Sequence, residues 1–140
     1  MAEGPLVAVV DDDQSIRNAT RDLLKAAGFS TATFGDAESF LGSASRASTA
    51  CLVADMRMPG MSGLELRLAL LASGDDIPTV LITAHPEEPA LSRAREAGIT
   101  CYLIKPFAPD ELLECVHEAL ASGKAALYLS LSRRYRRAAG

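Results

Sequence analysis

Residues 6–13 read LVAVVDDD, an apolar run of five residues that leads into three consecutive aspartates. A continuous apolar run of this length is typical of a strand buried on both faces, as in a parallel sheet that helices cover. The carboxyl ends of parallel strands open onto one crevice where ligands bind, so the polar residues that follow such strands should form one site. Three further runs end in the same way, at a carboxylate, a hydroxyl and an ammonium: residues 51–54 before Asp55, 79–82 before Thr83, and 101–104 before Lys105.

Segments with helical periodicity separate the apolar runs, so strands and helices alternate along the chain. Asp13 is a suitable N-cap for the first helix and Gly28 a natural stop after it, while Ser62 and Glu65 have the spacing of a capping box. A further, short strand is predicted at residues 30–34. The predicted helices cover residues 14–27, 36–45 with Asp36 as N-cap, 62–74, 87–97 and 109–123.

This alternation predicts the fold class. Five strands that alternate with five helices give a doubly wound α/β domain with a parallel sheet, because parallel strands need crossover connections that are nearly always right-handed. In the first helix, Ile16, Leu23, Leu24 and Ala27 share one face and should pack on the sheet. The fourth helix has only Leu91 as a large apolar residue, so we expect it to be the most loosely held.

Length and charge divide the chain into two parts. Its 140 residues and 49% apolar content suit a single packed domain. Residues 1–122 hold all 18 acidic residues and nine basic ones, whereas residues 123–140 hold five basic residues and no acidic one. We therefore predict a globular domain at 1–122 and a basic C-terminal tail or truncated linker at 123–140. An acidic body is a poor nucleic-acid surface, so no nucleic-acid partner is expected for the domain itself.

The three cysteines predict the redox compartment. Cys51, Cys101 and Cys115 lie in or beside apolar segments and show no metal-ligand spacing to one another or to His85 and His117. Buried free thiols in a reducing cytosol are the expected state. The N-terminus has no basic leader, and no segment approaches membrane-spanning length. We therefore expect a cytoplasmic protein with no membrane partner.

Asp11, Asp12 and Asp55 would concentrate negative charge at the predicted edge of the sheet, where it is self-repelling unless a cation shares the site. Oxygen ligands suit a hard ion, and Mg²⁺ binds through one or two carboxylates, often together with phosphate. Lys105 would add an ammonium and Thr83 a hydroxyl to the same edge. Such a shell positions phosphoryl oxygens and stabilises charge, with a carboxylate as the natural acceptor. The residues thus predict a magnesium-dependent site for phosphoryl transfer.

Over residues 5–122 the sequence resembles the receiver domain of bacterial two-component response regulators. The match consists of four motifs in order: VVDDD at 9–13, DMRMPGMSG at 55–63, LITA at 81–84 and YLIKPF at 102–107. This resemblance implies a flavodoxin-like fold with strand order 2-1-3-4-5. It also implies a signalling phosphoacceptor rather than an enzyme, assisting only its own phosphorylation and dephosphorylation. Its partner would be a sensor histidine kinase or a phosphotransfer protein, or it would react with a small phosphodonor.

The resemblance also assigns roles to residues at the predicted site. Asp55 would accept the phosphoryl group. Asp12, Asp55 and the main-chain carbonyl of Arg57 would bind Mg²⁺ directly. Asp11 would support the ion through a water molecule, and Mn²⁺ could substitute for Mg²⁺.

The same resemblance implies which residues respond to phosphorylation. Lys105 and Thr83 would contact the phosphoryl oxygens, and Tyr102 would be the aromatic residue that changes rotamer when Thr83 moves. Taken without the resemblance, Tyr102 is better explained as a half-buried strand residue with an exposed hydroxyl than as a switch, and the resemblance makes the two interpretations equal. Family members also have a cis peptide bond before the proline that corresponds to Pro106.

Two positions beside the acceptor bear on how long a phosphoryl group would last. In family members the side chains at the positions of Arg57 and His85 overhang the phosphoryl group. Both are bulky here, whereas a carboxamide or carboxylate could orient an attacking water, so we hypothesise a long-lived phosphoaspartate. The alternative is that both side chains simply face solvent. Pro86 and Pro89 should stiffen the loop before the fourth helix.

Two alternative functions are open at this point. Asp11 and Asp13 form an Asp-x-Asp after an apolar strand, as in magnesium-dependent phosphohydrolases of the haloacid dehalogenase type, where they would be nucleophile and acid/base. The chain is short for such an enzyme, and the motif at 55–59 would be unexplained. The other alternative is a receiver-like interaction module that is never phosphorylated. For a phosphorylated receiver, the output could be a DNA-binding domain outside this sequence, and the fourth helix, fifth strand and fifth helix could form a homodimer.

Overall fold

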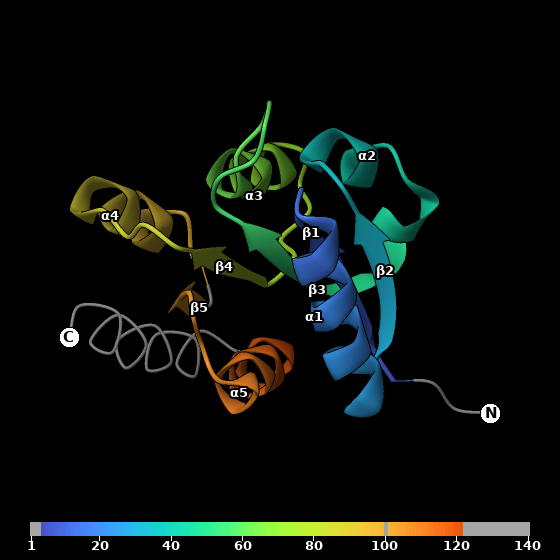
Figure 1. Ribbon diagram of the computed structural model, residues 1–140. Coiled ribbons are helices and arrows are strands. Elements are labelled where there is room, and N and C mark those ends of the chain that lie inside the picture. The colour runs from blue at the N-terminus through green and yellow to red at the C-terminus, as the bar shows by residue number, and fades with distance from the viewer. Residues whose placement is uncertain (1–3, 100, 122–140) are drawn as a thin grey trace.

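The computed structural model describes residues 4–99 and 101–121, in which one parallel sheet carries helices on both faces (Figure 1). The strands are β1 (Leu6–Val10), β2 (Ser30–Phe34), β3 (Thr49–Asp55), β4 (Thr79–Thr83) and β5 (Cys101–Ile104). The helices are α1 (Gln14–Ala26), α2 (Ala37–Leu41), α3 (Gly63–Ala72), α4 (Glu88–Glu96) and α5 (Pro109–Leu120), with a 3₁₀ helix η1 (Ala44–Ser48). The strand order is β2-β1-β3-β4-β5, so the predicted doubly wound, flavodoxin-like fold is confirmed.

The pairing register brings the strand ends level with one another. The last residue of β1 pairs with Ala54 of β3, so Asp11 and Asp55 follow in neighbouring positions. The last residues of β4 and β5 are themselves paired, which places Lys105 one residue beyond the position level with Thr83. The polar residues that follow the apolar runs therefore share one edge of the sheet.

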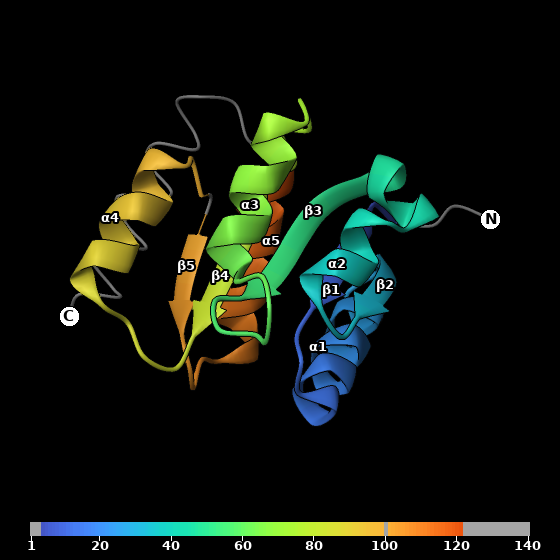
Figure 2. The same ribbon diagram turned by 90° about the horizontal axis from the view of Figure 1, so that it is seen from above.

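Both faces of the sheet are buried, and successive residues of a strand enter different cores. On β1, Ala8 and Val10 pack on the side of α2, α3 and α4, whereas Val7 and Val9 pack on the side of α1 and α5. Figure 2 views the sheet from the side of α2, α3 and α4, with α1 and α5 behind the strands. Burial on both faces explains why these strands read as continuous apolar runs rather than alternating ones.

Three helices begin at the predicted N-caps. The Asp13 carboxylate accepts a hydrogen bond of 3.1 Å from the backbone N–H three residues on, at the start of α1. Asp36 does the same at 2.7 Å for α2. Ser62 and Glu65 form the predicted capping box at the start of α3. These side chains satisfy backbone donors that the first turn of a helix leaves free.

The second helix is shorter than predicted. It ends at Leu41 rather than at Ser45, and a 3₁₀ helix follows. Gly42 is the C-cap, and the hydroxyl of Ser43 donates a hydrogen bond of 2.9 Å to the carbonyl of Phe40. This local bond gives the backbone an alternative to a further α-helical turn.

The packing face of α1 differs from the prediction at its end. Leu24 is buried, and Ile16 and Leu23 are partly buried, as their spacing predicts. Ala27 is exposed, because it is the C-cap and lies beyond the last helical residue. Thr20 takes the remaining buried position on this face.

Some predictions for the chain ends fall outside the described residues. The last helix ends at Leu120, and its predicted stop near Gly123 and the basic tail at 123–140 lie beyond the described part of the chain. None of the helices within 4–99 and 101–121 combines the length and apolar character needed to cross a bilayer. All three cysteines are buried, which confirms their predicted burial.

Candidate functional site

Three carboxylates meet at the carboxyl edge of the sheet. Asp11 directly follows β1, and Asp55 is the last residue of β3. Both are buried, whereas Asp12 is exposed. One oxygen of each of these three residues lies within 4.8 Å of the others. The structure therefore confirms the prediction that these three aspartates lie close together.

Lys105 brings an ammonium group to the same cluster. Its Nζ donates a hydrogen bond of 3.0 Å to Oδ2 of Asp55 and lies 3.8 Å from Oδ2 of Asp11. Its own backbone N–H donates to the carbonyl of Thr83 at 2.8 Å, which fixes the start of the side chain at the sheet edge. The Lys105–Pro106 peptide bond is cis, as the resemblance implies. The ammonium thus partly balances two buried carboxylates.

Backbone donors orient the two buried carboxylates. Oδ1 of Asp55 accepts a hydrogen bond of 3.1 Å from the N–H of Arg57, and Oδ1 of Asp11 accepts one of 2.9 Å from the N–H of Asp13. Arg17 of α1 also donates to the main-chain carbonyl of Asp11 at 2.6 Å. In each carboxylate one oxygen is held by the backbone and the other faces Lys105. The sequence prediction did not include Arg17, because its contact depends on how α1 lies against the strand end.

The start of α3 lies directly against the acceptor strand. A Cβ atom added to Gly63 would lie 2.5 Å from the main-chain oxygen of Asp55 and 2.9 Å from Cδ2 of Leu81. The backbone N–H of Gly63 also donates to the carbonyl of Met56 at 3.1 Å. This close approach requires a residue without a side chain. The packing of Gly63 against the main-chain oxygen of Asp55 therefore helps to position Asp55.

Thr83 ends β4 beside the acceptor strand and is buried. Its Oγ1 accepts a hydrogen bond of 3.1 Å from the backbone N–H of His85, so the hydroxyl is engaged with its own loop. The neighbouring carbonyl of Ile82 accepts from the N–H of Met56 at 2.7 Å, which ties the ends of β3 and β4 together. Thr83 therefore sits at the predicted edge, and its hydroxyl helps to shape the loop that leads to α4.

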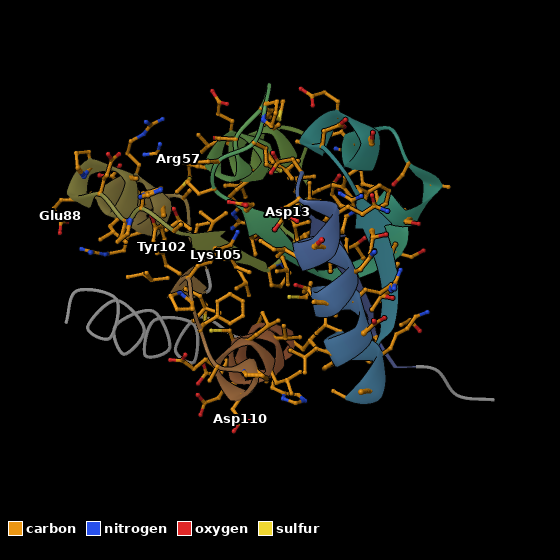
Figure 3. The ribbon with its side chains drawn as sticks, viewed as in Figure 1. Asp13, Arg57, Glu88, Tyr102, Lys105 and Asp110 are labelled. Carbon is orange, nitrogen blue, oxygen red and sulfur yellow. The ribbon has the colours of Figure 1, made fainter. Side chains whose placement is uncertain are left out.

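Tyr102 of β5 is only 1% exposed, and its hydroxyl oxygen is buried (Figure 3). The interpretation of a half-buried residue with an exposed hydroxyl is therefore wrong. The ring packs in the core shared by α2, α3 and α4, on the side that faces α4. Burial raises the pKa of the Tyr102 hydroxyl, the charge of Glu87 raises it further, and that of Arg57 lowers it.

Arg57 and His85, the two residues beside the acceptor, both have exposed side chains. The guanidinium of Arg57 forms an ion pair with Glu87, with Nη2 3.5 Å from Oε2. Glu87 is the N-cap residue of α4. No local sequence pattern indicates this pair, because it links two loops whose relative position depends on the packing of α4.

Electrostatics in the cluster favour a bound cation. Burial raises the pKa of Asp11, and the charges of Asp55 and Asp12 raise it further, while the Asp13 N–H and Lys105 lower it. The three carboxylates therefore repel one another even with Lys105 present. Three neighbouring oxygen donors suit a hard divalent ion. Asp11, Asp12 and Asp55 form an acidic pocket compatible with such an ion.

The site is thus a buried carboxylate that accepts a hydrogen bond from a lysine, at the carboxyl edge of a doubly wound five-stranded sheet, where such sheets bind their ligands. The family model described as the response regulator receiver domain matches residues 7–117, and the chain belongs to this family. Receiver domains are signalling phosphoacceptors that generally interact with histidine kinases. Membership favours the receiver prediction over the phosphohydrolase alternative.

Similar proteins include full-length regulators. The chain is 35% identical over 115 residues to the response regulator protein TodT of Pseudomonas putida (strain F1), and this alignment covers 82% of the chain and 51% of TodT. It is 34% identical over 120 residues to the transcriptional regulatory protein FixJ of Bradyrhizobium diazoefficiens, which covers 86% of the chain and 58% of FixJ. Among solved structures, response regulator StyR is 44% identical with a TM-score of 0.76, covering 97% of this chain and 65% of that one. The chain thus spans roughly half the length of these two curated relatives.

Proposed function

We propose that this receiver accepts a phosphoryl group on Asp55, in a Mg²⁺-dependent reaction, and relays it as a conformational or partner switch. The donor would be a sensor histidine kinase, a phosphotransfer protein or a small phosphodonor. The observation that carries the proposal is the 3.0 Å contact between Nζ of Lys105 and Oδ2 of Asp55, inside a cluster with Asp11 and Asp12. A buried carboxylate in this setting is an oriented nucleophile next to a fixed positive charge.

The chemistry follows from this geometry. A carboxylate oxygen of Asp55 attacks the phosphorus of the donor, an acyl phosphate forms, and the bond between phosphorus and the donor atom breaks. The electron pair of that bond leaves with the donor. The N–H of Arg57 holds one carboxylate oxygen in place, and Lys105 lies where it can pair with the phosphoryl oxygens. Positioning and charge stabilisation supply most of the catalysis in reactions of this kind.

The donor set fits Mg²⁺, and Mn²⁺ could substitute for it. Asp12, Asp55 and the main-chain carbonyl of Arg57 would hold the ion, with Asp11 supporting it through water. A bound divalent ion would neutralise the carboxylates and the incoming phosphoryl oxygens. Burial raises the pKa of Asp11, and the charges of Asp55 and Asp12 raise it further, so a cation at this place would favour the ionised carboxylate.

Phosphorylation would be transmitted through Thr83 and Tyr102. The phosphoryl group adds charge and strong acceptor oxygens, so Lys105 and the Thr83 hydroxyl would rearrange around it. Thr83 now accepts from His85, and its movement would alter the loop in front of α4. Tyr102, packed on the α4 side, would change rotamer with it. The surface formed by α4, β5 and α5 would then change partners, with a homodimer as one outcome.

Incubation with acetyl phosphate, with and without Mg²⁺, tests the proposal when intact mass is measured on wild type and Asp55→Asn. We expect one added phosphoryl group that depends on Mg²⁺ and is absent from Asp55→Asn. Asp13→Asn is a matched control, since it lacks one carboxylate at the same edge but should still accept phosphate. Release of inorganic phosphate through Asp11 without modification of Asp55 would favour a phosphohydrolase instead, and neither gain nor release would favour a module that signals by binding alone.

The stability of the phosphoryl group is a separate proposal. Arg57 and His85 are exposed beside the acceptor, and neither provides a carboxamide or carboxylate to orient an attacking water. We propose a long-lived phosphoaspartate, which should decay faster in Arg57→Asn. A decay in Arg57→Asn no faster than in wild type would count against it.

The output and location of the protein are also proposals. FixJ is named a transcriptional regulatory protein, and the chain matches only 58% of it. We therefore propose a DNA-binding output domain as the downstream element in the full regulator, with no nucleic-acid contact by the receiver itself. The three buried cysteine thiols support a reducing compartment such as the cytoplasm.

A further inference from the structure

A weak ion pair connects the acceptor loop to the start of α4. Arg57 lies two residues after Asp55, and its guanidinium is 3.5 Å from the carboxylate of Glu87. The two side chains are 59% and 63% exposed. Since Glu87 is the N-cap residue of α4, the pair joins the phosphoacceptor loop directly to the first turn of this helix.

We infer that Arg57 is a two-position latch for α4. In the unphosphorylated protein its guanidinium holds Glu87, and with it the first turn of α4. When Asp55 carries a phosphoryl group, the guanidinium turns to the phosphoryl oxygens and releases that turn. The inference rests on the proposed phosphorylation of Asp55, and it adds the residue pair through which the phosphoryl group reaches α4.

Arg57 is placed to serve both partners. Its backbone N–H donates to Oδ1 of Asp55 at 3.1 Å, so its side chain starts beside the acceptor. More than half of that side chain is exposed, which leaves it free to change rotamer. A phosphoryl group carries nearly two negative charges and three acceptor oxygens, and the guanidinium fork pairs with such a group through parallel hydrogen bonds. The phosphoryl group is therefore the stronger partner for Arg57.

The contact with Glu87 is easily exchanged. At 3.5 Å and with both side chains exposed, an ion pair contributes little stability and is screened by salt. The same weakness means that a small change in charge at Asp55 suffices to redirect Arg57. A strong, buried pair at this place would resist the exchange.

The first turn of α4 has few other anchors. Glu87 makes no side-chain capping hydrogen bond, and Pro89 in the first turn has no backbone N–H to donate. Residues 84–89 are all exposed. Leu91 and Ala90 pack against the core at the end of this turn, whereas the pair with Arg57 is a side-chain contact that ties Glu87 itself to the acceptor loop.

The opposite end of α4 is firmly held. Arg67 of α3 is buried, and it donates hydrogen bonds to the carbonyl of Ala97 at 2.9 Å and of Gly98 at 3.4 Å. A third bond, of 2.7 Å, reaches the carbonyl of Ile77 before β4. Because one end is held by buried bonds and the other by an exposed pair, release of Glu87 would let α4 move about its C-terminal end.

Tyr102 lies close to the latch. Burial raises the pKa of its hydroxyl, the charge of Glu87 raises it further and that of Arg57 lowers it, so the pair acts electrostatically on this hydroxyl. Tyr102 packs on the α4 side of the sheet. Opening of the pair would therefore change the surroundings of the residue that we propose as part of the switch.

Hydrogen exchange of the peptide that covers 84–92, read by mass spectrometry, tests the latch. Wild type, Glu87→Gln and the matched control Glu88→Gln are compared before and after treatment with acetyl phosphate and Mg²⁺. Intact mass of the same samples reports the phosphorylated fraction. Before treatment, the amide of Leu91, which donates to the carbonyl of Glu87 at 3.0 Å, should exchange about two- to fivefold faster in Glu87→Gln than in wild type, while Glu88→Gln should match wild type. After phosphorylation, wild type should reach the rate of Glu87→Gln, which should itself change little.

A second comparison ties the effect to Arg57. Arg57→Gln should accelerate exchange as Glu87→Gln does, and the double variant should show no further increase, because either substitution breaks the same pair. A phosphorylated wild type with unchanged exchange in 84–92 would overturn the latch while leaving the proposed function intact. An equal acceleration of Glu87→Gln upon phosphorylation would also overturn it. No added phosphoryl group on wild type would overturn the proposed function and the latch together.

Discussion

Lys105 sets the charge balance between two buried carboxylates, Asp11 and Asp55. In each carboxylate, Oδ1 accepts a hydrogen bond from a backbone N–H. The ammonium of Lys105 lies 3.0 Å from Oδ2 of Asp55 and 3.8 Å from Oδ2 of Asp11. Burial nevertheless raises the pKa of Asp11, with Asp55 and Asp12 adding to the effect. One ammonium therefore does not fully compensate the cluster, and the folded protein favours protonation of Asp11.

This balance predicts how Asp11→Asn changes stability with pH. A carboxyl group whose pKa is higher in the folded than in the unfolded chain stabilises the fold at low pH, and that stability is lost as pH rises through the folded pKa. In EDTA at pH 7, Asp11→Asn should therefore be more stable than wild type by on the order of 1 kcal/mol. The advantage should shrink as pH falls through the raised pKa of folded Asp11, and it should be lost once pH reaches the ordinary pKa of an aspartate. Urea unfolding between pH 3.5 and 7 measures the difference.

Two additions make the Asp11→Asn measurement decisive. Asp110→Asn, at the exposed start of α5, is the control and should bring no gain at pH 7. Mg²⁺ should stabilise wild type more than Asp11→Asn, because a ligand stabilises the folded state according to its affinity for it. Parallel pH profiles for Asp11→Asn and wild type would contradict the electrostatic account.

The location of the site was predictable from the sequence because each aspartate, Thr83 and Lys105 ends or directly follows an apolar strand. Strand ends of a parallel sheet share an edge, so no side-chain detail was needed. The Arg57–Glu87 pair and the burial of the Tyr102 hydroxyl depend instead on where α4 lies against the sheet. No local pattern encodes that position, which is why the sequence could not supply them.

At the scale of elements, the contact between the start of α3 and the end of β3 positions the acceptor. Gly63 begins α3 immediately after the N-cap Ser62, and its missing side chain lets the helix lie against the carbonyl of Asp55. The capping box was visible in the sequence as Ser62 and Glu65. The sequence did not show that position 63 requires glycine, because this requirement comes from contact with the end of β3, eight residues earlier in the chain.

Gly63→Ala should therefore destabilise the protein by about 1–3 kcal/mol, as overpacking does, even though alanine is the better helix former. The added Cβ would meet the Asp55 carbonyl at 2.5 Å, and the resulting shift should also slow phosphorylation by acetyl phosphate. Gly35→Ala is the matched control, since its Cβ would meet only Nη1 of Arg17, at 3.5 Å. Urea unfolding measures stability, and intact mass over time measures phosphorylation. Equal stability of the two variants would refute the proposed close packing.

The helices also show where periodicity fails as a guide. On α3, Leu68 and Leu71 are 43% and 37% exposed, whereas Arg67 is buried. Arg67 is buried because three main-chain carbonyls around it accept hydrogen bonds from its guanidinium, and Asp76 lies 2.9 Å away. These carbonyls lie 10 to 31 residues away along the chain, so the periodicity of the helix could not predict the burial of Arg67. Because Arg67 holds the carbonyls of Ala97 and Gly98 just after α4, the expectation that α4 is loosely held applies best to its first turn.

At the scale of the whole molecule, the sheet divides the interior into two cores that must form together. Every central strand supplies residues to both, so neither core can be lost alone without exposing the other.

The three cysteines all lie in the core beneath α1 and α5. Burial, with a smaller effect of Cys101, raises the pKa of the Cys51 thiol from 9.0 to about 12. Cys51 is therefore a reporter of global unfolding.

Comparison of wild type with Cys51→Ala at pH 7.5 and pH 10 checks this cooperative burial. The thiol ionises near pH 9 in the unfolded chain but keeps its proton to about pH 12 in the folded one, so wild-type stability falls as pH rises between these values. At pH 7.5, Cys51→Ala should be less stable by about 1–2 kcal/mol because of the cavity it leaves. At pH 10 that gap should narrow by about 1.4 kcal/mol, since each pH unit above the unfolded pKa changes the free energy of unfolding by roughly that amount. Urea unfolding gives both values, and a gap that stays constant between the two pH values would mean that Cys51 ionises without unfolding the core.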